Sequence, residues 1–199
     1  MKRVIIFLLI VIVSIQTIQA HNPLSAMYYL EVKENINILN INLSQNGLNE
    51  ALKKQYSKID FKELSTTEYK QLAVNYLKEN FHLDINGQAI KLLEGGLKLG
   101  KHQTDAKFIV SGLPKTFENL FVKIEAFIEN EHHQTVFSLL LKGNTSKVIL
   151  NKNNNYSASV RFKDHLMVVN SATFNKNYLW CFALIPIFLI GKKLIAKRN

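Results

Sequence analysis

Three histidines have the residue type and spacing that could hold a metal ion. His21 directly follows Ala20, after which a secretory leader would be cut, and His132 and His133 are adjacent in the chain. If cleavage makes His21 the first residue, its free amine and its imidazole Nδ1 can chelate one copper or nickel ion. A second histidine would then close the site. Other histidines available for that role are His82, His102 and His165.

A second interpretation treats these histidines as ordinary surface residues. The segment "ENEHHQ", residues 129–134, has the composition of a hairpin turn. Adjacent residues on a strand point to opposite faces, so His132 and His133 would not both face one ligand there. We therefore expect solvated turn histidines, and the metal site at His21, His132 and His133 is the alternative.

Motifs that could support catalysis are incomplete. "LLEGGLKLG", residues 92–100, lacks the phosphate-loop pattern because His102 follows Lys101, and we interpret it as a loop. "LPKTF", residues 113–117, ends in phenylalanine where a sortase signal has glycine, and it indicates a turn. No serine lies in a Gly-x-Ser-x-Gly elbow, and no carboxylate pair is isolated among apolar residues. We expect no enzymatic activity, no catalytic residue and, apart from copper or nickel, no cofactor.

Both ends of the chain have the patterns of membrane targeting. Residues 1–20 combine a basic start, an unbroken apolar stretch and a small final residue, which is typical of a signal peptide. Residues 178–196 are long enough to cross a bilayer as one helix, with two lysines near the end. The basic residues that end the chain, within 192–199, indicate that this end, including the tail 197–199, is cytoplasmic. The sequence thus predicts a single-pass protein of the cell membrane.

The positive charge of the chain does not indicate nucleic-acid binding. The net charge is +10, from 25 basic and 15 acidic residues. Between the termini, lysine and glutamate are interspersed and form no basic stripe. We therefore expect the membrane, and other membrane or envelope proteins, as partners. Six of the basic residues lie in the terminal segments, namely Lys2, Arg3, Lys192, Lys193, Lys197 and Arg198.

The segment between the targeting signals is predicted to fold as one β-rich domain over residues 21–162. Alternating apolar residues at 35–43 predict a strand with a bulge near Leu39. Asn86-Gly87 is a strong hairpin signal. Helical spacing is found at 47–56 and 65–81, and other strands are expected at 27–33, 106–113, 119–130, 134–143, 146–151 and 156–162.

These elements predict an α+β, mostly β, fold. We expect an antiparallel immunoglobulin-like β-sandwich, with the two helices inserted after the first hairpin. Ser65 and Glu68 form a capping box that marks the start of the second helix. Residues 163–177 are polar with few apolar anchors and are predicted to form a stalk that leads to the membrane. The domain would lie on the extracytoplasmic side, periplasmic or extracellular.

Three segments resemble a family of uncharacterised bacterial exported domains whose mature form starts near a His-Pro pair. They are "HNPLSAMYYLEV", "NYLKENFHLDINGQAIKL" and "HHQTVFSLLLKG". Relatives of this type accompany HupE/UreJ-like membrane proteins, which are associated with nickel uptake. This chain differs by having Asn22 between His21 and Pro23. The resemblance implies an exported domain with a link to metal handling, and it brings no catalytic residues.

Together, these observations predict a membrane-anchored extracytoplasmic binding or assembly module without catalytic activity. The alternative is an accessory protein that binds copper or nickel through His21.

Overall fold

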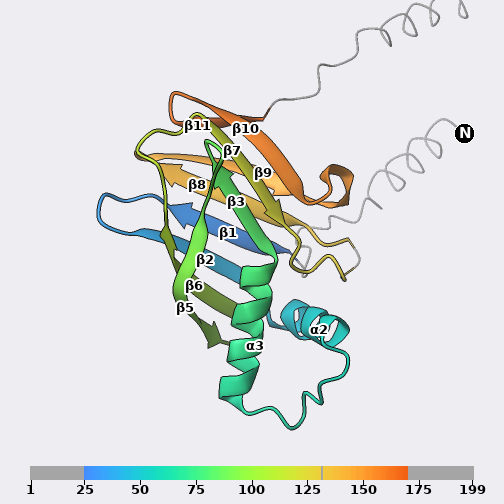
Figure 1. Ribbon diagram of the computed structural model, residues 1–199. Helices are drawn as coiled ribbons and strands as arrows, with labels where there is room; N and C mark the ends of the chain where they lie inside the picture. The colour runs from blue at the N-terminus through green and yellow to red at the C-terminus, as the bar shows by residue number, and fades with distance from the viewer. Residues whose placement is uncertain (1–24, 131, 170–199) are drawn as a thin grey trace, which may run out of the picture. The chain divides into compact units, whose positions relative to one another are not determined.

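The computed structural model describes residues 25–130 and 132–169 (Figure 1). The predicted signal peptide (1–20), most of the stalk (163–177), the membrane helix (178–196) and the tail (197–199) lie outside these residues. No helix in the described part of the chain has both the length and the apolar character needed to span a bilayer.

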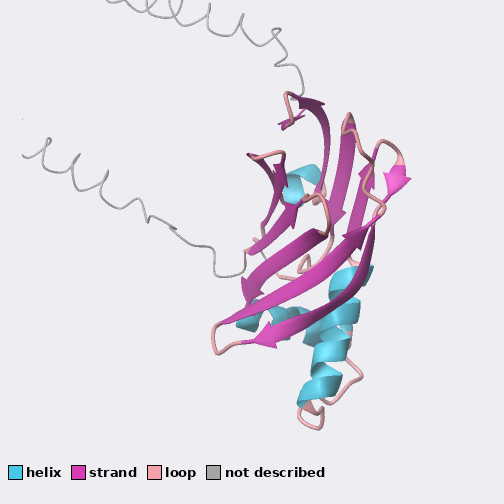
Figure 2. Cartoon of the chain, turned by 90° about the vertical axis from the view of Figure 1, so that its left-hand side faces the viewer, coloured by secondary structure: helices cyan, strands magenta, loops and turns pink. Residues whose placement is uncertain are grey.

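Two packed sheets form the body of the domain (Figures 1 and 2). The six-stranded sheet has the order β5 (Lys91–Leu99), β6 (Gln103–Ser111), β2 (Asn37–Ser44), β1 (Ala26–Glu31), β8 (Thr135–Leu141), β9 (Asn144–Leu150). The five-stranded sheet has the order β11 (Leu166–Val169), β10 (Ser157–Lys163), β7 (Asn119–Ile124), β3 (Phe81–Ile85), β4 (Gln88–Ala89).

Two helices follow the first hairpin, as the sequence predicts. They are α2 (Gln45–Gln55) and α3 (Thr66–Glu79), and Figure 2 shows them together at one end of the sheets. Helix α3 runs along β5 and also contacts β3. Each helix turns its apolar side toward the sheets, where Leu48 and Leu52 of α2 and Leu77 of α3 are fully buried.

The core consists of inward-facing residues from both sheets. In β2, Leu39, Ile41 and Leu43 are buried at every second position, as expected of a strand with one covered face. In β7, Leu120 and Val122 are buried in the same way from the other sheet. The prediction of a mostly β α+β domain with two packed, sandwich-like sheets is confirmed.

The expectation of a wholly antiparallel arrangement is wrong at one strand pair. β1 pairs in parallel with β8, with Ala26 opposite Thr135 and Leu30 opposite Leu139. The strands β1 and β8 are more than a hundred residues apart in the sequence, so no short turn constrains their relative direction.

The predicted bulge near Leu39 is also wrong. β2 pairs with β1 and β6 in continuous register. The two consecutive apolar residues need no bulge, because Leu39 points into the core and Ile38 points outward. The alternation rule alone could not show that the outward side also carries an apolar residue. The irregularity lies in β5, between Leu92 and Gly95.

The segment 92–100, interpreted from the sequence as a loop, is largely strand β5. Its glycines do not interrupt the strand. A side chain at Gly95 would overlap the Phe108 ring of β6, so glycine is required there for the two strands to pair.

The largest differences from the predicted strands are at the end of β7 and at the end of the domain. The strand expected over 119–130 ends at Ile124, and a turn follows in which Phe127 is buried with a φ of 72°. At the other end, residues 163–169, part of the expected stalk, lie in the five-stranded sheet, where β11 pairs with β10. The folded domain therefore continues past residue 162 to Val169.

Replacing Ser65 by alanine should destabilise α3 and the domain by about 1 kcal/mol. The Ser65 hydroxyl accepts from the Glu68 N–H at 3.3 Å, and the Glu68 carboxylate accepts from the Ser65 N–H at 2.8 Å. The hydrogen bonds from the Ser65 side chain and backbone hold the pKa of Glu68 below its usual value. The carboxylate's contribution is therefore complete above its unfolded pKa and is lost as the pH falls through the folded value.

Urea unfolding at neutral and acid pH measures both effects. The difference in free energy of unfolding between wild type and Ser65→Ala should be smaller at acid pH, where Glu68 is protonated. An equal difference at both pH values would contradict the assigned role of the carboxylate.

Candidate functional site

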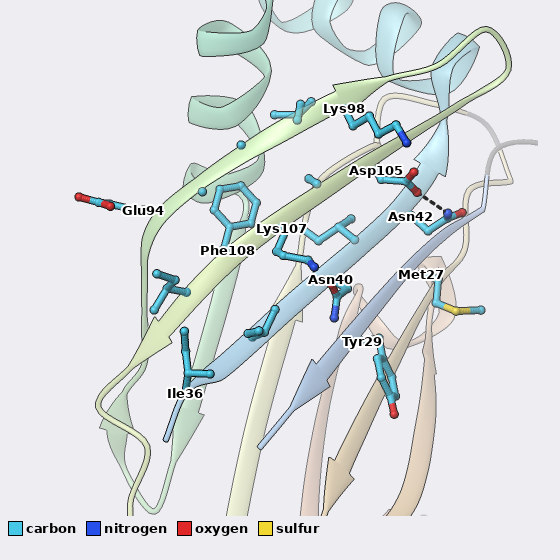
Figure 3. A pocket seen from close by; sticks show the side chains of 17 residues that line it. Met27, Tyr29, Ile36, Asn40, Asn42, Glu94, Lys98, Asp105, Lys107 and Phe108 are labelled. Atoms are coloured by element: carbon cyan, nitrogen blue, oxygen red, sulfur yellow. Dashed lines mark hydrogen bonds between the residues drawn. The ribbon is translucent and has the colours of Figure 1, made fainter. Parts of the chain in front are cut away.

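The side of the six-stranded sheet that faces away from the core is open within the described part of the chain. We call it the open face and define it by the outward residues of β1, β2, β5 and β6. The helices pack on the inner side, where the Lys78 Nζ of α3 lies 5.7 Å from the centre of the inward Phe108 ring. A groove of about 950 Å³ crosses the open face (Figure 3).

Strand register sets the order of side chains across the open face. One row runs from Lys107 in β6 through Asn40 in β2 to Tyr29 in β1. A neighbouring row has Asp105, Asn42 and Met27 at the same strands. The Asn42 Nδ2 donates to the Asp105 Oδ1 at 2.8 Å (Figure 3). Polar side chains therefore occupy the middle of the face.

Apolar side chains lie on both sides of this polar middle. Met27 is 50% exposed on β1, and Ile109, on β6, is 38% exposed directly opposite the outward Ile38 of β2. Large apolar side chains grouped on an open sheet are typical of an interaction surface.

One position on β5 that lines the groove carries no side chain. Gly96 lies opposite Lys107, and a Cβ placed on it would meet no atom within 4 Å. The charges around the groove are balanced, with Lys98 and Lys107 as bases and Glu94 and Asp105 as acids. Mixed charge around apolar residues fits a protein partner better than a polyanion such as nucleic acid.

His133 and His132 lie in the turn that leads into β8. His133 is only 1% exposed, so the expectation that both histidines are solvated is wrong for this residue. Its Nε2 lies 2.8 Å from the Thr135 Oγ1, and its ring centre lies 5.2 Å from that of Phe127. His132 is exposed, with a φ of 58°. Burial of His133 arises from the Phe127 turn, which sequence alternation did not reveal.

A small cavity of about 510 Å³ adjoins both histidines and is also lined by Asn151 and Tyr156. No cluster of three or more potential metal-ligating side chains of His, Cys, Asp or Glu occurs among residues 25–130 and 132–169. His21, the third predicted ligand, lies outside the described residues. The other histidines are dispersed: His82 is in β3, His102 precedes β6, and His165 is in the turn before β11.

Replacing His133 by alanine should lower the free energy of unfolding by about 2 kcal/mol, since it removes a packed ring and leaves the buried Thr135 hydroxyl without this partner. His82→Ala, at an exposed strand position, should change it by less than about 0.5 kcal/mol. Urea unfolding in the presence of a metal chelator measures the free energy change for both variants. Equal, small changes would show that His133 has no structural role.

The open face was not identified from the sequence. Its signal was the presence of apolar residues at outward positions, such as Met27, Ile38 and Ile109, but inward and outward could not be assigned without the strand partners. Neither a scan against protein-family models nor a search of curated proteins finds a match for the chain. Fold and site together define a sandwich-like α+β domain with an amphipathic sheet face that is open among the residues the structure describes.

Proposed function

We propose that the chain is a membrane-anchored, extracytoplasmic, non-catalytic module on an immunoglobulin-like sandwich, and that its open face binds another envelope protein. The observation that supports this proposal is the group of exposed apolar side chains around the groove, namely Met27, Ile36 and Ile109. The targeting patterns in 1–20 and 178–196 support the location.

The composition of the open face supports a protein as the partner. Protein interfaces combine an apolar centre with polar groups that form hydrogen bonds, and tyrosine is common among their strongest contacts. Tyr29 lies directly opposite Asn40, and on the outward side of β1 it is next to the exposed Met27. The hydrogen-bonded pair Asn42 and Asp105 would fix the orientation of a partner that also contacts the apolar side chains.

Photo-crosslinking in intact cells tests this function. A photoreactive phenylalanine at position 29 should give a discrete protein adduct, whereas the same residue at Ile59, exposed in the loop after α2, should give none. Ile109→Asp should abolish the adduct at position 29, because a carboxylate in the apolar contact is costly to desolvate. An unchanged adduct, or equal adducts at both positions, would contradict binding by the open face.

A second candidate function is binding of copper or nickel by His21 together with the histidine turn. The Ala26 N–H donates to the Gln134 carbonyl at 3.2 Å, so the start of β1 lies beside the segment that contains His132 and His133. Five residue steps separate His21 from Ala26, a reach of about 17 Å in an extended chain. The resemblance to exported domains associated with nickel uptake points the same way.

Metal titration distinguishes this second function from the first. Protein processed in cells, with a native N-terminus, is titrated with Cu²⁺ or Ni²⁺ and compared with His21→Ala and with His82→Ala as the matched control. Loss of binding in His21→Ala alone would support the site. Equal binding by all three, or none, would remove it.

A further inference from the structure

The β10–β11 hairpin has an outward side that combines apolar and basic residues. Lys163 is directly opposite Leu166, and Arg161 is directly opposite Val168. Directly opposed residues of an antiparallel pair point to the same side of the sheet. The intervening pair, Phe162 and Met167, packs against the core instead.

The apolar members of this side are exposed. Leu166 is 40% exposed and Val168 is 47% exposed. Phe121 of β7 adds an exposed aromatic ring on the outer face of the same sheet. Within the described residues, no helix covers this part of the five-stranded sheet (Figure 1).

The charge of the hairpin is positive on this side. Arg161 and Lys163 are its basic residues. The segment 157–169 has one acidic residue, Asp164, which lies in the turn between the two strands. Basic side chains beside exposed apolar ones are the pattern of surfaces that bind anionic lipid, because the charges attract the headgroups and the apolar groups enter the interface.

The position of the hairpin in the chain indicates which surface it meets. Nine residue steps separate Val169 from Tyr178, where the predicted membrane helix begins, a reach of at most about 30 Å. The hairpin is thus the part of the described domain closest in sequence to the bilayer. We propose that the outward side of the β10–β11 hairpin docks on the anionic lipid surface of the membrane that anchors the chain. This inference depends on the anchoring in the proposed function.

Lipid quenching in nanodiscs tests the docking with the full chain. Cys181 is replaced by serine, and a fluorophore is attached to Leu166→Cys or, as a control of similar exposure on the open face, to Ile109→Cys. Nanodiscs contain phosphatidylcholine alone or with phosphatidylglycerol, each with a lipid that carries a nitroxide quencher near the headgroup. The label at position 166 should be quenched about twofold or more beyond that at 109 in the anionic discs, with a smaller difference in the neutral ones.

Charge variants separate docking from mere proximity. Arg161→Gln combined with Lys163→Gln should bring quenching at position 166 down to the level at 109, while the urea midpoint stays unchanged. A chain that remains in the nanodiscs with equal quenching at the two positions would overturn the docking and leave the anchoring intact. A chain that does not remain in the nanodiscs would overturn both. Quenching at 166 that is the same in neutral and anionic discs would overturn the assigned role of the charge.

Discussion

Tyr76→Phe should lower the free energy of unfolding by about 2 kcal/mol, while the same substitution at Tyr28 should raise it by about 1 kcal/mol. Both rings are fully buried, so the two variants remove the same atom from similar surroundings. The difference lies in the hydrogen bonds that each hydroxyl makes.

The Tyr76 hydroxyl joins α3 to the turn after β7. It accepts from the buried Phe127 N–H at 2.6 Å and donates to the Glu129 carboxylate at 2.9 Å. Burial raises the pKa of Tyr76, so the hydroxyl keeps its proton and donates at neutral pH. Phenylalanine would leave the Phe127 N–H unpaired, at a residue whose φ of 72° already needs support.

The Tyr28 hydroxyl has no hydrogen-bond partner among the described residues. Its ring stacks on that of Phe81, with centres 5.9 Å apart and planes inclined by 4°. Phenylalanine would keep this contact and remove an unpaired buried hydroxyl. Urea unfolding of both variants measures the two changes. Equal losses of stability would show that the hydroxyl of Tyr28 is satisfied in solution.

Gly95→Ala should destabilise the domain by about 2–3 kcal/mol. An ideal Cβ at this position lies 2.5 Å from the Lys107 carbonyl oxygen and overlaps the Phe108 ring. The carbonyl belongs to the backbone of β6, so the clash can be relieved only by moving one strand away from the other. Strand pairing at the edge of the six-stranded sheet would be weakened.

Gly96→Ala is the matched control for this substitution. A Cβ there meets nothing within 4 Å, and stability should stay within about 0.5 kcal/mol of wild type. Thermal and urea unfolding measure both variants. If the two alanines cost the same, the close contact between Gly95 and Phe108 is not what requires glycine. A larger side chain at Gly96, such as tryptophan, should occupy part of the groove and reduce photo-crosslinking from position 29.

The features that the sequence predicted correctly depend on neighbouring residues. The Ser65–Glu68 capping box forms at the start of α3 because its partners are three residues apart. Asn86 and Gly87 adopt φ values of 54° and 78°, the positive values that a tight hairpin turn requires. The mostly β composition and the position of the two helices follow from the same local patterns.

The features that the sequence did not predict depend on residues that are distant in the chain. Gly95 resembles a loop glycine until Phe108 is placed against it. Ile38 resembles a break in the alternation until Ile109 is found opposite it. His133 resembles a turn residue until the Phe127 turn packs on its ring.

The sequence alone therefore determined the types and order of most elements, since capping, turn geometry and apolar periodicity act over a few residues. It did not reveal β5, which was interpreted as a loop, or β11, which was expected to be part of the stalk. The tertiary structure decided the parallel pairing of β1 with β8, the burial of His133 and which side of the six-stranded sheet the described residues leave open. These features depend on which distant strands meet and in what register, and a one-residue change of register would turn every outward side chain inward.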